Sequence, residues 1–319
     1  MAFLKEESKM QSKASPLLIV GSMAFDDLEL PTISAKNVVG GSATYSAYAA
    51  TVFAPVRLVA VVGEDFPSGD LEALSRRNVD LAGVERADGK TFRWAGRYDT
   101  NLMSRVTLET QLNVFADFQP KLPRSYTDSS YVLLGNIHPT LQCDVLDQVS
   151  HPKLVIADTM NFWIEGEPDA VAAMLKRADV LVINEEEARQ LSGHHNISKA
   201  AKDILRRGPK ALIVKRGEYG ALLFDGSSTF FAPAYPLEDI VDPTGAGDTF
   251  AGAMAGYLAK TNDVSAAGLR RAVMVGSAAA SFCVEAVGTA KIGRLSGQDV
   301  NSRLESFRRL MHVPDEEVN

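Results

Sequence analysis

The sequence has few of the residues that build disulfides or metal clusters. Its 319 residues include only two cysteines, Cys143 and Cys283, both in apolar stretches of helical pattern. We therefore expect reduced, inert thiols in a cytoplasmic protein. No cluster of histidine and cysteine has metal-ligand spacing, and the pair His194-His195 follows a glycine in a predicted surface loop.

Long apolar runs and an excess of positive charge are also missing. The longest helical stretch of small residues, about 266–284, contains Arg270 and Arg271, so no segment has the composition of a membrane span. The net charge of −7 and the lack of any basic run argue against a nucleic-acid partner. Residues 1–15 lack the apolar core of a signal peptide, so we predict a disordered tail there and a second tail at 313–319. Residues 16–312 then suffice for one large domain.

Short apolar runs alternate with helical patterns along this domain. The runs are continuous rather than alternating, which is typical of strands buried on both faces of a parallel sheet. We therefore predict an α/β fold with three layers, α/β/α, around a mainly parallel sheet, and ligands beyond the carboxyl ends of its strands. The predicted strands are 17–21, 57–62, 131–134, 154–157, 180–184, 211–215, 221–224 and 229–232, and the predicted helices are 42–53, 69–77, 140–149, 169–177, 185–191, 197–206, 248–260, 265–284 and 298–311.

Two segments, at about 25–38 and 91–118, interrupt this alternation. The second contains FRWAGRY at residues 92–98, where large and polar side chains alternate as in an exposed antiparallel strand pair. We predict that the two segments pair into one small sheet, although an ordinary surface excursion gives the same pattern.

The most informative string is VDPTGAGDTF at residues 241–250. Gly245 and Gly247 leave room for consecutive backbone N–H groups to face one bound atom, and they stand where a helix begins. The unpaired donors and the dipole at such a helix start favour an anion. Asp248 adds a carboxylate that can take a proton from a hydroxyl group, an arrangement that suits phosphoryl transfer. The signatures GxxxxGK[ST] and strand–GxGxxG are absent from the sequence.

This string resembles the DTTGAGD signature of the ribokinase-like (PfkB) family of carbohydrate kinases. The resemblance covers roughly residues 17–310. It implies an ATP-dependent phosphotransferase that phosphorylates a hydroxymethyl group of a sugar, with Asp248 as the catalytic base. The anion hole would consist of Gly245, Ala246 and Gly247. The two inserted segments would form a β-lid over the acceptor, which in this family is often also the interface of a homodimer.

Other motifs follow in the order of the family. The acceptor side is implied by Asp26, by the pair Gly40-Gly41 before a helix, and, by location only, by Asn136. The family commonly has asparagine at the position of Tyr45, and ribokinases often have it at that of Ala24. These departures make a plain ribose or fructose acceptor doubtful.

The resemblance also implies a nucleotide and metal side. Asn184 and Glu187 match a motif associated with Mg²⁺ through water, which agrees with the few direct ligands that Mg²⁺ needs; a helix start that complements its dipole is the structural alternative. Asp242 would contribute to a monovalent cation site, with K⁺ as the candidate ion. The implied nucleotide-binding residues are Asn161, Lys215, Gly217, Gly220 and Gly288.

Three other functions remain open at this stage. Phe25, Tyr45, Trp94 and Tyr98 could line a flat pocket that stacks on a nucleobase, as in a nucleoside kinase of the same family. A kinase of small heterocyclic vitamins fits less well, because those relatives lack a lid. A non-catalytic nucleotide-binding protein on the same fold would not need Asp248.

Overall fold

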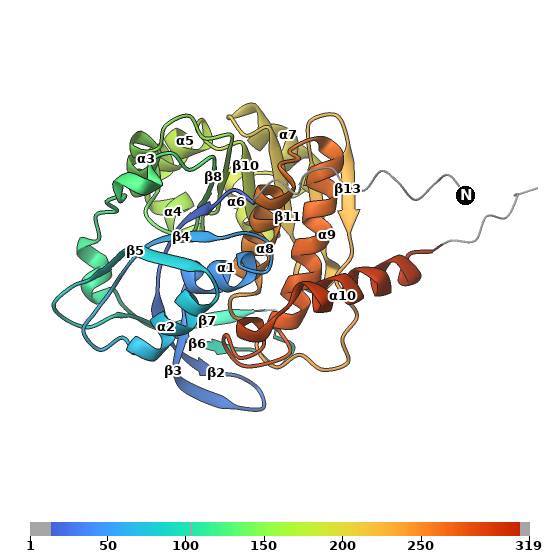
Figure 1. The fold of residues 1–319 in the computed structure, drawn as a ribbon. Coiled ribbons are helices and arrows are strands. Elements are labelled where there is room, and N and C mark those ends of the chain that lie inside the picture. The colour runs from blue at the N-terminus through green and yellow to red at the C-terminus, as the bar shows by residue number, and fades with distance from the viewer. Residues whose placement is uncertain (1–13, 103, 313–319) are drawn as a thin grey trace, which may run out of the picture.

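A nine-stranded sheet forms the centre of the molecule, in the order β13-β12-β11-β10-β9-β8-β1-β4-β5 (Figure 1). The computed structural model describes residues 14–102 and 104–312, so most of both predicted tails lies outside the described residues. All neighbouring strands from β11 to β5 run parallel, and β12 and β13 extend the sheet as antiparallel hairpins. The strands are β1 Leu17–Val20, β4 Val56–Val62, β5 Val79–Arg86, β8 Tyr131–Leu134, β9 Leu154–Ala157, β10 Val180–Asn184, β11 Ala211–Lys215, β12 Ala221–Phe224 and β13 Thr229–Ala232.

The mainly parallel sheet is confirmed, and the strands from β8 to β13 have the predicted bounds. Strand β5 was not predicted, because its side chains are mostly half-exposed or exposed and it contains Gly83. A Cβ at Gly83 would lie 2.6 Å from the carbonyl oxygen of Leu58 on β4, so glycine permits close pairing at this edge of the sheet.

Helices cover both faces of the sheet, which confirms the three layers (Figure 1). Successive residues of β1 show the division: Leu17 and Ile19 pack into one apolar core, and Leu18 and Val20 into the other. The first core lies under α1 Ser42–Ala50, α2 Ser68–Arg76, α8 Ala246–Thr261 and α9 Ala266–Cys283. The second lies under α3 Pro139–Gln148, α5 Pro168–Leu175, α6 Glu185–Ser192 and α7 Ile197–Arg206.

The remaining helices are peripheral. Helix α4 Asn161–Gly166 contacts α5 and α6, and α10 Gly297–Leu310 packs Val300 and Phe307 in an apolar cluster that also includes Val275 of α9. Short 3-10 turns span Asn113–Asp117, Arg124–Tyr126, Gly217–Tyr219 and Ile292–Arg294. Within the described ranges, no helix is long and apolar enough to cross a membrane.

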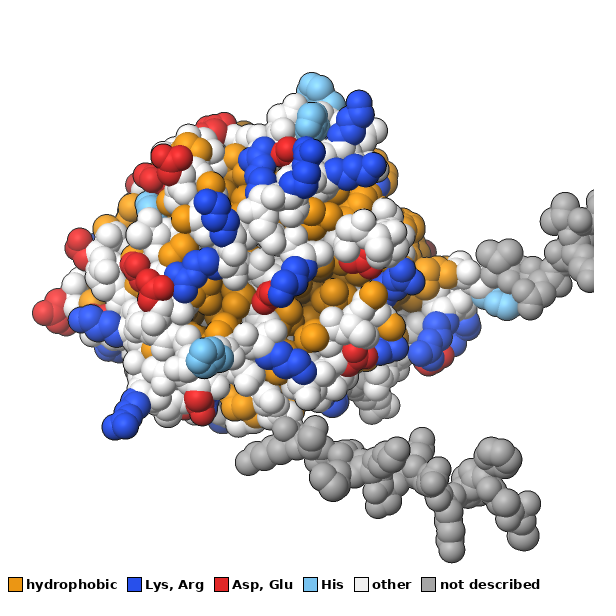
Figure 2. Space-filling view, turned by 90° about the horizontal axis from the view of Figure 1, so that it is seen from above, with side chains coloured by type: hydrophobic (Ala, Val, Ile, Leu, Met, Phe, Trp, Pro, Cys, Tyr) orange, Lys and Arg blue, Asp and Glu red, His pale blue; other side chains and the backbone are white. Residues whose placement is uncertain are grey.

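A second, four-stranded sheet has the order β3-β2-β6-β7 and lies at the lower side of Figure 1. Its strands are β2 Ala24–Glu29, β3 Ser34–Gly40, β6 Phe92–Tyr98 and β7 Arg105–Gln111. Strand β2 pairs with β6, so the two inserted segments form one sheet, as predicted. We call this sheet the lid. Figure 2 shows the opposite side of the molecule, seen from above in Figure 1, where acidic and basic side chains are interspersed.

The backbones of helices α1 and α8 are in close contact. A Cβ at Gly252 of α8 would lie 2.2 Å from the carbonyl oxygen of Ser46, and one at Gly256 would lie 2.7 Å from that of Ala50. Ser46 of α1 also donates its hydroxyl hydrogen to the carbonyl oxygen of Asp248, over 3.0 Å. This close contact of the two helix backbones therefore fixes the first turn of α8 against α1.

Candidate active site

Three neighbouring strands end in polar side chains that point toward one place. Asn184 ends β10 and Lys215 ends β11, and the two are paired directly in the sheet register. Asp158 follows the last residue of β9, and its carboxyl group lies 3.5 Å from the ammonium group of Lys215. Because the carboxyl ends of parallel strands share one edge, the sheet brings these three residues together.

The first turn of α8 supplies the backbone groups of the predicted anion hole. The helix begins at Ala246, two residues earlier than predicted, and Gly245 is its N-cap with a φ of 74°. That conformation favours glycine. Among the described residues, no acceptor is hydrogen-bonded to the N–H group of Gly245 or of Gly247. These two donors are available to an anion.

A positive side chain lies beside the same donors. A Cβ at Gly247 would be 2.9 Å from the Lys215 Nζ atom, so the ammonium group is next to the helix start. Burial opposes the charge of Lys215, but Asp158, Glu187 and Asp248 outweigh it and raise the pKa of the ammonium group. We predicted Lys215 as a nucleotide-binding residue, and it lies between the helix start and Asp158.

Asp248 occupies the third position of α8. Burial, followed by the repulsion of Asp158, raises the pKa of its carboxyl group to about 6, although Lys215 and Arg105 act in the opposite direction. A carboxyl group with a pKa near neutrality is a better general base than an ordinary aspartate. The first turn of α8 therefore brings a carboxyl group with a raised pKa and two free N–H donors next to the Lys215 ammonium group.

Asp242 holds the loop before α8 in shape. Its side chain is fully buried, one carboxyl oxygen accepts the N–H of Thr244, and the other accepts the N–H of Gly288. Gly288 has a φ of 58°, and a Cβ there would lie 2.4 Å from Val38 of the lid. The carboxylate thus links two loops predicted to face the nucleotide. Its part in a cation site stays a prediction.

Asp26 lies on the lid strand β2, over the main sheet. Its side chain is buried, and no described residue donates a hydrogen bond to its carboxyl group. Burial, followed by repulsion from Asp242 and Asp248, raises its pKa to about 8. An unpartnered carboxyl group on the acceptor side can accept hydrogen bonds from the hydroxyl groups of a ligand.

The glycine pair before α1 makes room for this carboxyl group. A Cβ at Gly40 would lie 2.0 Å from Asp26 Oδ2, and Gly41 has a φ of 92° with the carbonyl oxygen of Ser22 close by. Gly40 and Gly41, which we predicted on the acceptor side, thus lie in close contact with protein atoms.

Tyr45 fills the position where the family commonly has asparagine. Its ring packs on Gly245, where a Cβ would lie 2.3 Å from a ring carbon. The side chain is 1% exposed, and its hydroxyl group has no hydrogen-bond partner among the described residues. Tyr45 therefore supports the loop of residues 243–247, which we call the anion-hole loop after its predicted role.

The predicted magnesium residues form a capping box at the start of α6. Asn184 Oδ1 accepts the N–H of Glu187, and Glu187 Oε2 accepts the N–H of Asn184. Glu187 is buried, and burial together with Asp158 raises its pKa to about 7. Its other carboxyl oxygen has no hydrogen bond to a described residue, and no group of three acidic, histidine or cysteine side chains there could cage a metal. Asn184 and Glu187 therefore fit Mg²⁺, an ion that keeps most of its water ligands when it binds to a protein.

The remaining predicted residues lie around this centre. Asn136, after β8, accepts a hydrogen bond from Trp163 and donates one to the sulfur of Met160. Asn161 begins α4, next to Met160. Gly217 and Gly220 shape the turn between β11 and β12, and a Cβ at Gly220 would lie 2.1 Å from the carbonyl oxygen of Ala232. Close packing against the backbone of Ala232 therefore explains why residue 220 is a glycine.

The lid contacts the anion-hole loop directly. The hydroxyl groups of Tyr98 on β6 and Thr244 lie 2.9 Å apart and share a hydrogen bond. This contact was not predicted. Tyr98 stands in an alternating strand, and such a strand gives no sign of its partner.

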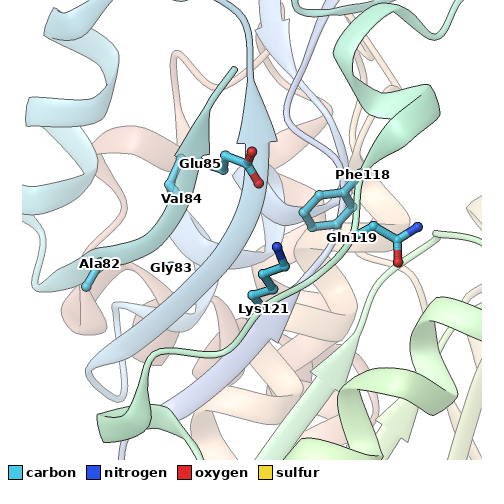
Figure 3. Close-up of a pocket in the computed structure, with 7 residues that line it drawn as sticks. All are labelled: Ala82, Gly83, Val84, Glu85, Phe118, Gln119 and Lys121. Carbon is cyan, nitrogen blue, oxygen red and sulfur yellow. The ribbon is translucent and has the colours of Figure 1, made fainter. Parts of the chain in front are cut away.

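The hollow in Figure 3 is separate from this centre. It has a volume of about 150 Å³ and lies between the edge strand β5 and the segment that follows the 3-10 turn Asn113–Asp117. Its lining residues are Ala82, Gly83, Val84, Glu85, Phe118, Gln119 and Lys121, none of which we predicted to bind a ligand.

Known proteins share both the sequence pattern and the fold. Residues 20–293 match the pfkB family of carbohydrate kinases. A cytidine kinase of Thermococcus kodakarensis is 31% identical over 248 residues, which cover 76% of this chain and 88% of that protein. The ribokinase of Thermotoga maritima has the same fold, with a TM-score of 0.73 and 24% identity over 91% of this chain and 99% of that one. The ribokinase of Arabidopsis thaliana, complexed with ribose and ATP, gives a TM-score of 0.74 at 24% identity, over 92% and 99% of the two chains.

Proposed function

Because the chain belongs to the pfkB family of carbohydrate kinases, we propose that it transfers the terminal phosphoryl group of ATP to a hydroxymethyl group of a sugar. One observation carries the proposal: the free N–H groups of Gly245 and Gly247, the Lys215 ammonium group and the Asp248 carboxyl group meet at the start of α8. Phosphoryl transfer needs positioning and charge stabilisation more than covalent chemistry from the protein.

The residues have distinct parts in the reaction. Asp248 takes the proton of the acceptor hydroxyl, whose oxygen then bonds to phosphorus as the bond from phosphorus to ADP breaks. The N–H groups of Gly245 and Gly247, with Lys215, stabilise the negative charge that is shared by the phosphoryl oxygens. Asp26 accepts hydrogen bonds from other hydroxyl groups of the acceptor and so orients it.

The nucleotide is proposed to lie along the turn from Lys215 to Gly220 and beside the loop of Gly288. A cavity of about 430 Å³, lined in part by Phe282, Ala286 and Ala290, adjoins that loop and offers apolar surface to a base. Mg²⁺, held by Glu187 and Asn184 through water, would neutralise phosphate charge. The relative solved with ribose and ATP supports ATP as the donor.

The acceptor class separates this proposal from a nucleoside kinase on the same fold. The related cytidine kinase and the apolar lid residues Leu28, Trp94 and Tyr98 favour the nucleoside as second candidate. ADP formation would be measured with ATP, Mg²⁺ and a panel of ribose, fructose, ketodeoxygluconate, adenosine and cytidine. A sugar with the highest kcat/KM supports the proposal, a nucleoside replaces it, and no turnover with any acceptor refutes both.

We also propose a cytoplasmic homodimer joined through the lid. Strand β7 is an edge strand, and Val106, Leu108 and, just after it, Leu112 are exposed there. Such an unpaired edge with apolar side chains is suited to a second copy. Light scattering of the wild type and of V106K/L108K would test it, since the dimer should be lost in the double variant.

A further inference from the structure

The underside of the lid carries a cation that the proposed reaction has not yet used. Arg105 is the first residue of β7, and it is paired directly with Tyr98 across the antiparallel ladder. Directly opposite residues of such a pair project to the same face of the sheet. Since the Tyr98 hydroxyl group reaches Thr244 in the anion-hole loop, Arg105 belongs to the face that covers that loop.

Two further contacts place Arg105 on this face. Its guanidinium carbon lies 6.0 Å from the centre of the Trp94 ring. Trp94 in turn donates a hydrogen bond to Thr107, two residues after Arg105 on β7. Trp94 packs with Leu28 and Tyr98 of the lid. These contacts agree with the pairing of Arg105 and Tyr98.

No carboxylate of the described residues neutralises Arg105. Within the described ranges it forms no ion pair, whereas Arg97 of the neighbouring strand is paired with Glu29 over 2.5 Å. Arg97 lies next to Tyr98 in sequence, so its side chain projects to the outer face of the lid. Arg105 and Arg97 therefore lie on opposite faces of the lid. Among the described residues, Arg97 has an ion-pair partner and Arg105 has none.

The positive charge of Arg105 acts on carboxyl groups that lie outside the lid. It is among the groups that lower the pKa of Asp248 and of Glu187, although burial dominates both. Lys215 adjoins the free N–H groups of Gly245 and Gly247, and Arg105 lies on the lid face that covers the same loop.

We propose that Arg105 is a catalytic residue that contacts the phosphoryl group as it passes from donor to acceptor. A guanidinium group binds phosphate oxygens through two parallel hydrogen bonds. In the transfer, the acceptor oxygen loses its proton to Asp248 and bonds to phosphorus while the bond to the ADP oxygen breaks. Arg105 stabilises the charge on the oxygens between them, and the lid thereby supplies part of the catalysis. This inference rests on the proposed kinase function.

The test compares R105M and R105K with the matched control R97M, each with the best acceptor of the panel. We expect R105M to lower kcat about 100- to 1,000-fold, as loss of one charge-stabilising donor does, with the KM for ATP changed less than about threefold. R105K should recover part of the loss, and R97M should have wild-type kinetics. Aluminium fluoride with ADP, Mg²⁺ and acceptor, a mimic of the transferring group, should inhibit R105M far less tightly than the wild type.

Three results would overturn the assignment: a kcat of R105M within threefold of the wild type, an equal loss in R97M, or a rise in acceptor KM alone. The last would place Arg105 at an anionic group of the acceptor. An active wild type with any of these results leaves the kinase function standing. A wild type that phosphorylates no acceptor refutes the kinase function itself, and the role of Arg105 with it.

Discussion

At the scale of single residues, the site holds carboxyl groups in surroundings that disfavour their charge. Asp26 and Asp248 are raised from an ordinary pKa of 3.8 to about 8 and about 6. Buried carboxyl groups without paired donors lower stability and are found where a ligand completes their interactions. Both residues yield predictions that depend on pH.

The first prediction concerns the stability of the variant D26N. The folded protein holds the Asp26 proton more tightly than the unfolded chain, so the free energy of unfolding decreases as the pH rises from about 4 to about 8. Asparagine removes this loss, and D26N should be more stable than the wild type at pH 9, with a smaller difference at pH 5. Urea unfolding at both pH values measures the difference in the free energy of unfolding between D26N and the wild type.

The control is D27N on the outer face of β2, where the Asp27 carboxylate accepts the N–H of Asn37. An advantage of D26N that is the same at pH 5 and pH 9 would show that the Asp26 carboxyl group is not held protonated by the fold.

The second prediction concerns the pH dependence of catalysis. A general base must be ionised, and the pKa of Asp248 is raised to about 6. We expect kcat/KM to fall about tenfold per pH unit below that pKa. A profile that is flat down to pH 5, with ATP affinity unchanged over the range, would exclude Asp248 as the base.

At the scale of elements, the start of α8 is held by packing that only glycine allows. Gly252 faces the backbone of α1, whereas Gly69 of α2 has open space around its Cα atom. We predict that G252A lowers the free energy of unfolding by about 1–3 kcal/mol through overpacking. G69A should raise it by about 0.5–1 kcal/mol because alanine favours the helix. Equal stability of the two variants in urea would contradict the packing.

The second prediction at this scale concerns the hydrogen bond between Tyr98 and Thr244. Removing it in Y98F should weaken lid closure by about 1 kcal/mol, roughly fivefold in kcat/KM for the acceptor. The looser lid should also admit water, so more ADP should form per phosphorylated acceptor. In a double-mutant cycle, Y98F and T244V should show coupling of similar size. Additive effects would mean that the bond does not hold the lid.

The elements were predictable to the extent that their own residues specify them. The strands from β8 to β13 are bounded by turn residues and are continuous apolar runs, so their ends could be placed from the sequence. Strand β5 has the mixed exposure of an edge, and its pairing depends on Gly83, which reads locally as a strand breaker.

The site was predictable where a motif carries its own chemistry. The anion hole and Asp248 lie in one string, and the helix start follows from its glycines. The positions of Lys215 and Asp158 relative to that string depend on the order of strands in the sheet, which no single segment reveals. Arg105 stands in an exposed polar strand, and only its pairing with Tyr98 places it over the site.

At the scale of the whole molecule, the fold brings a floor and a cover to one anion site. The floor is the carboxyl edge of β9, β10 and β11 with the start of α8, and the cover is a small sheet built from two distant segments. The family assignment fixes a phosphotransferase. Of the two departures from the family, Ala24 lies in the cover, on β2, and Tyr45 lies on α1, where its ring packs on Gly245. In the proposed reaction the floor supplies the base and the anion hole, and the cover supplies Arg105 and the contacts of Asp26 with the acceptor.

The most direct test of this account is the rate of ADP formation by D248N with ATP, Mg²⁺ and the best acceptor. The account predicts a loss of about 100- to 10,000-fold in kcat, the usual contribution of a general base, with circular dichroism and ATP affinity like those of the wild type. Near-normal turnover by D248N would contradict the assignment of Asp248 as the base and, with it, the proposed active site.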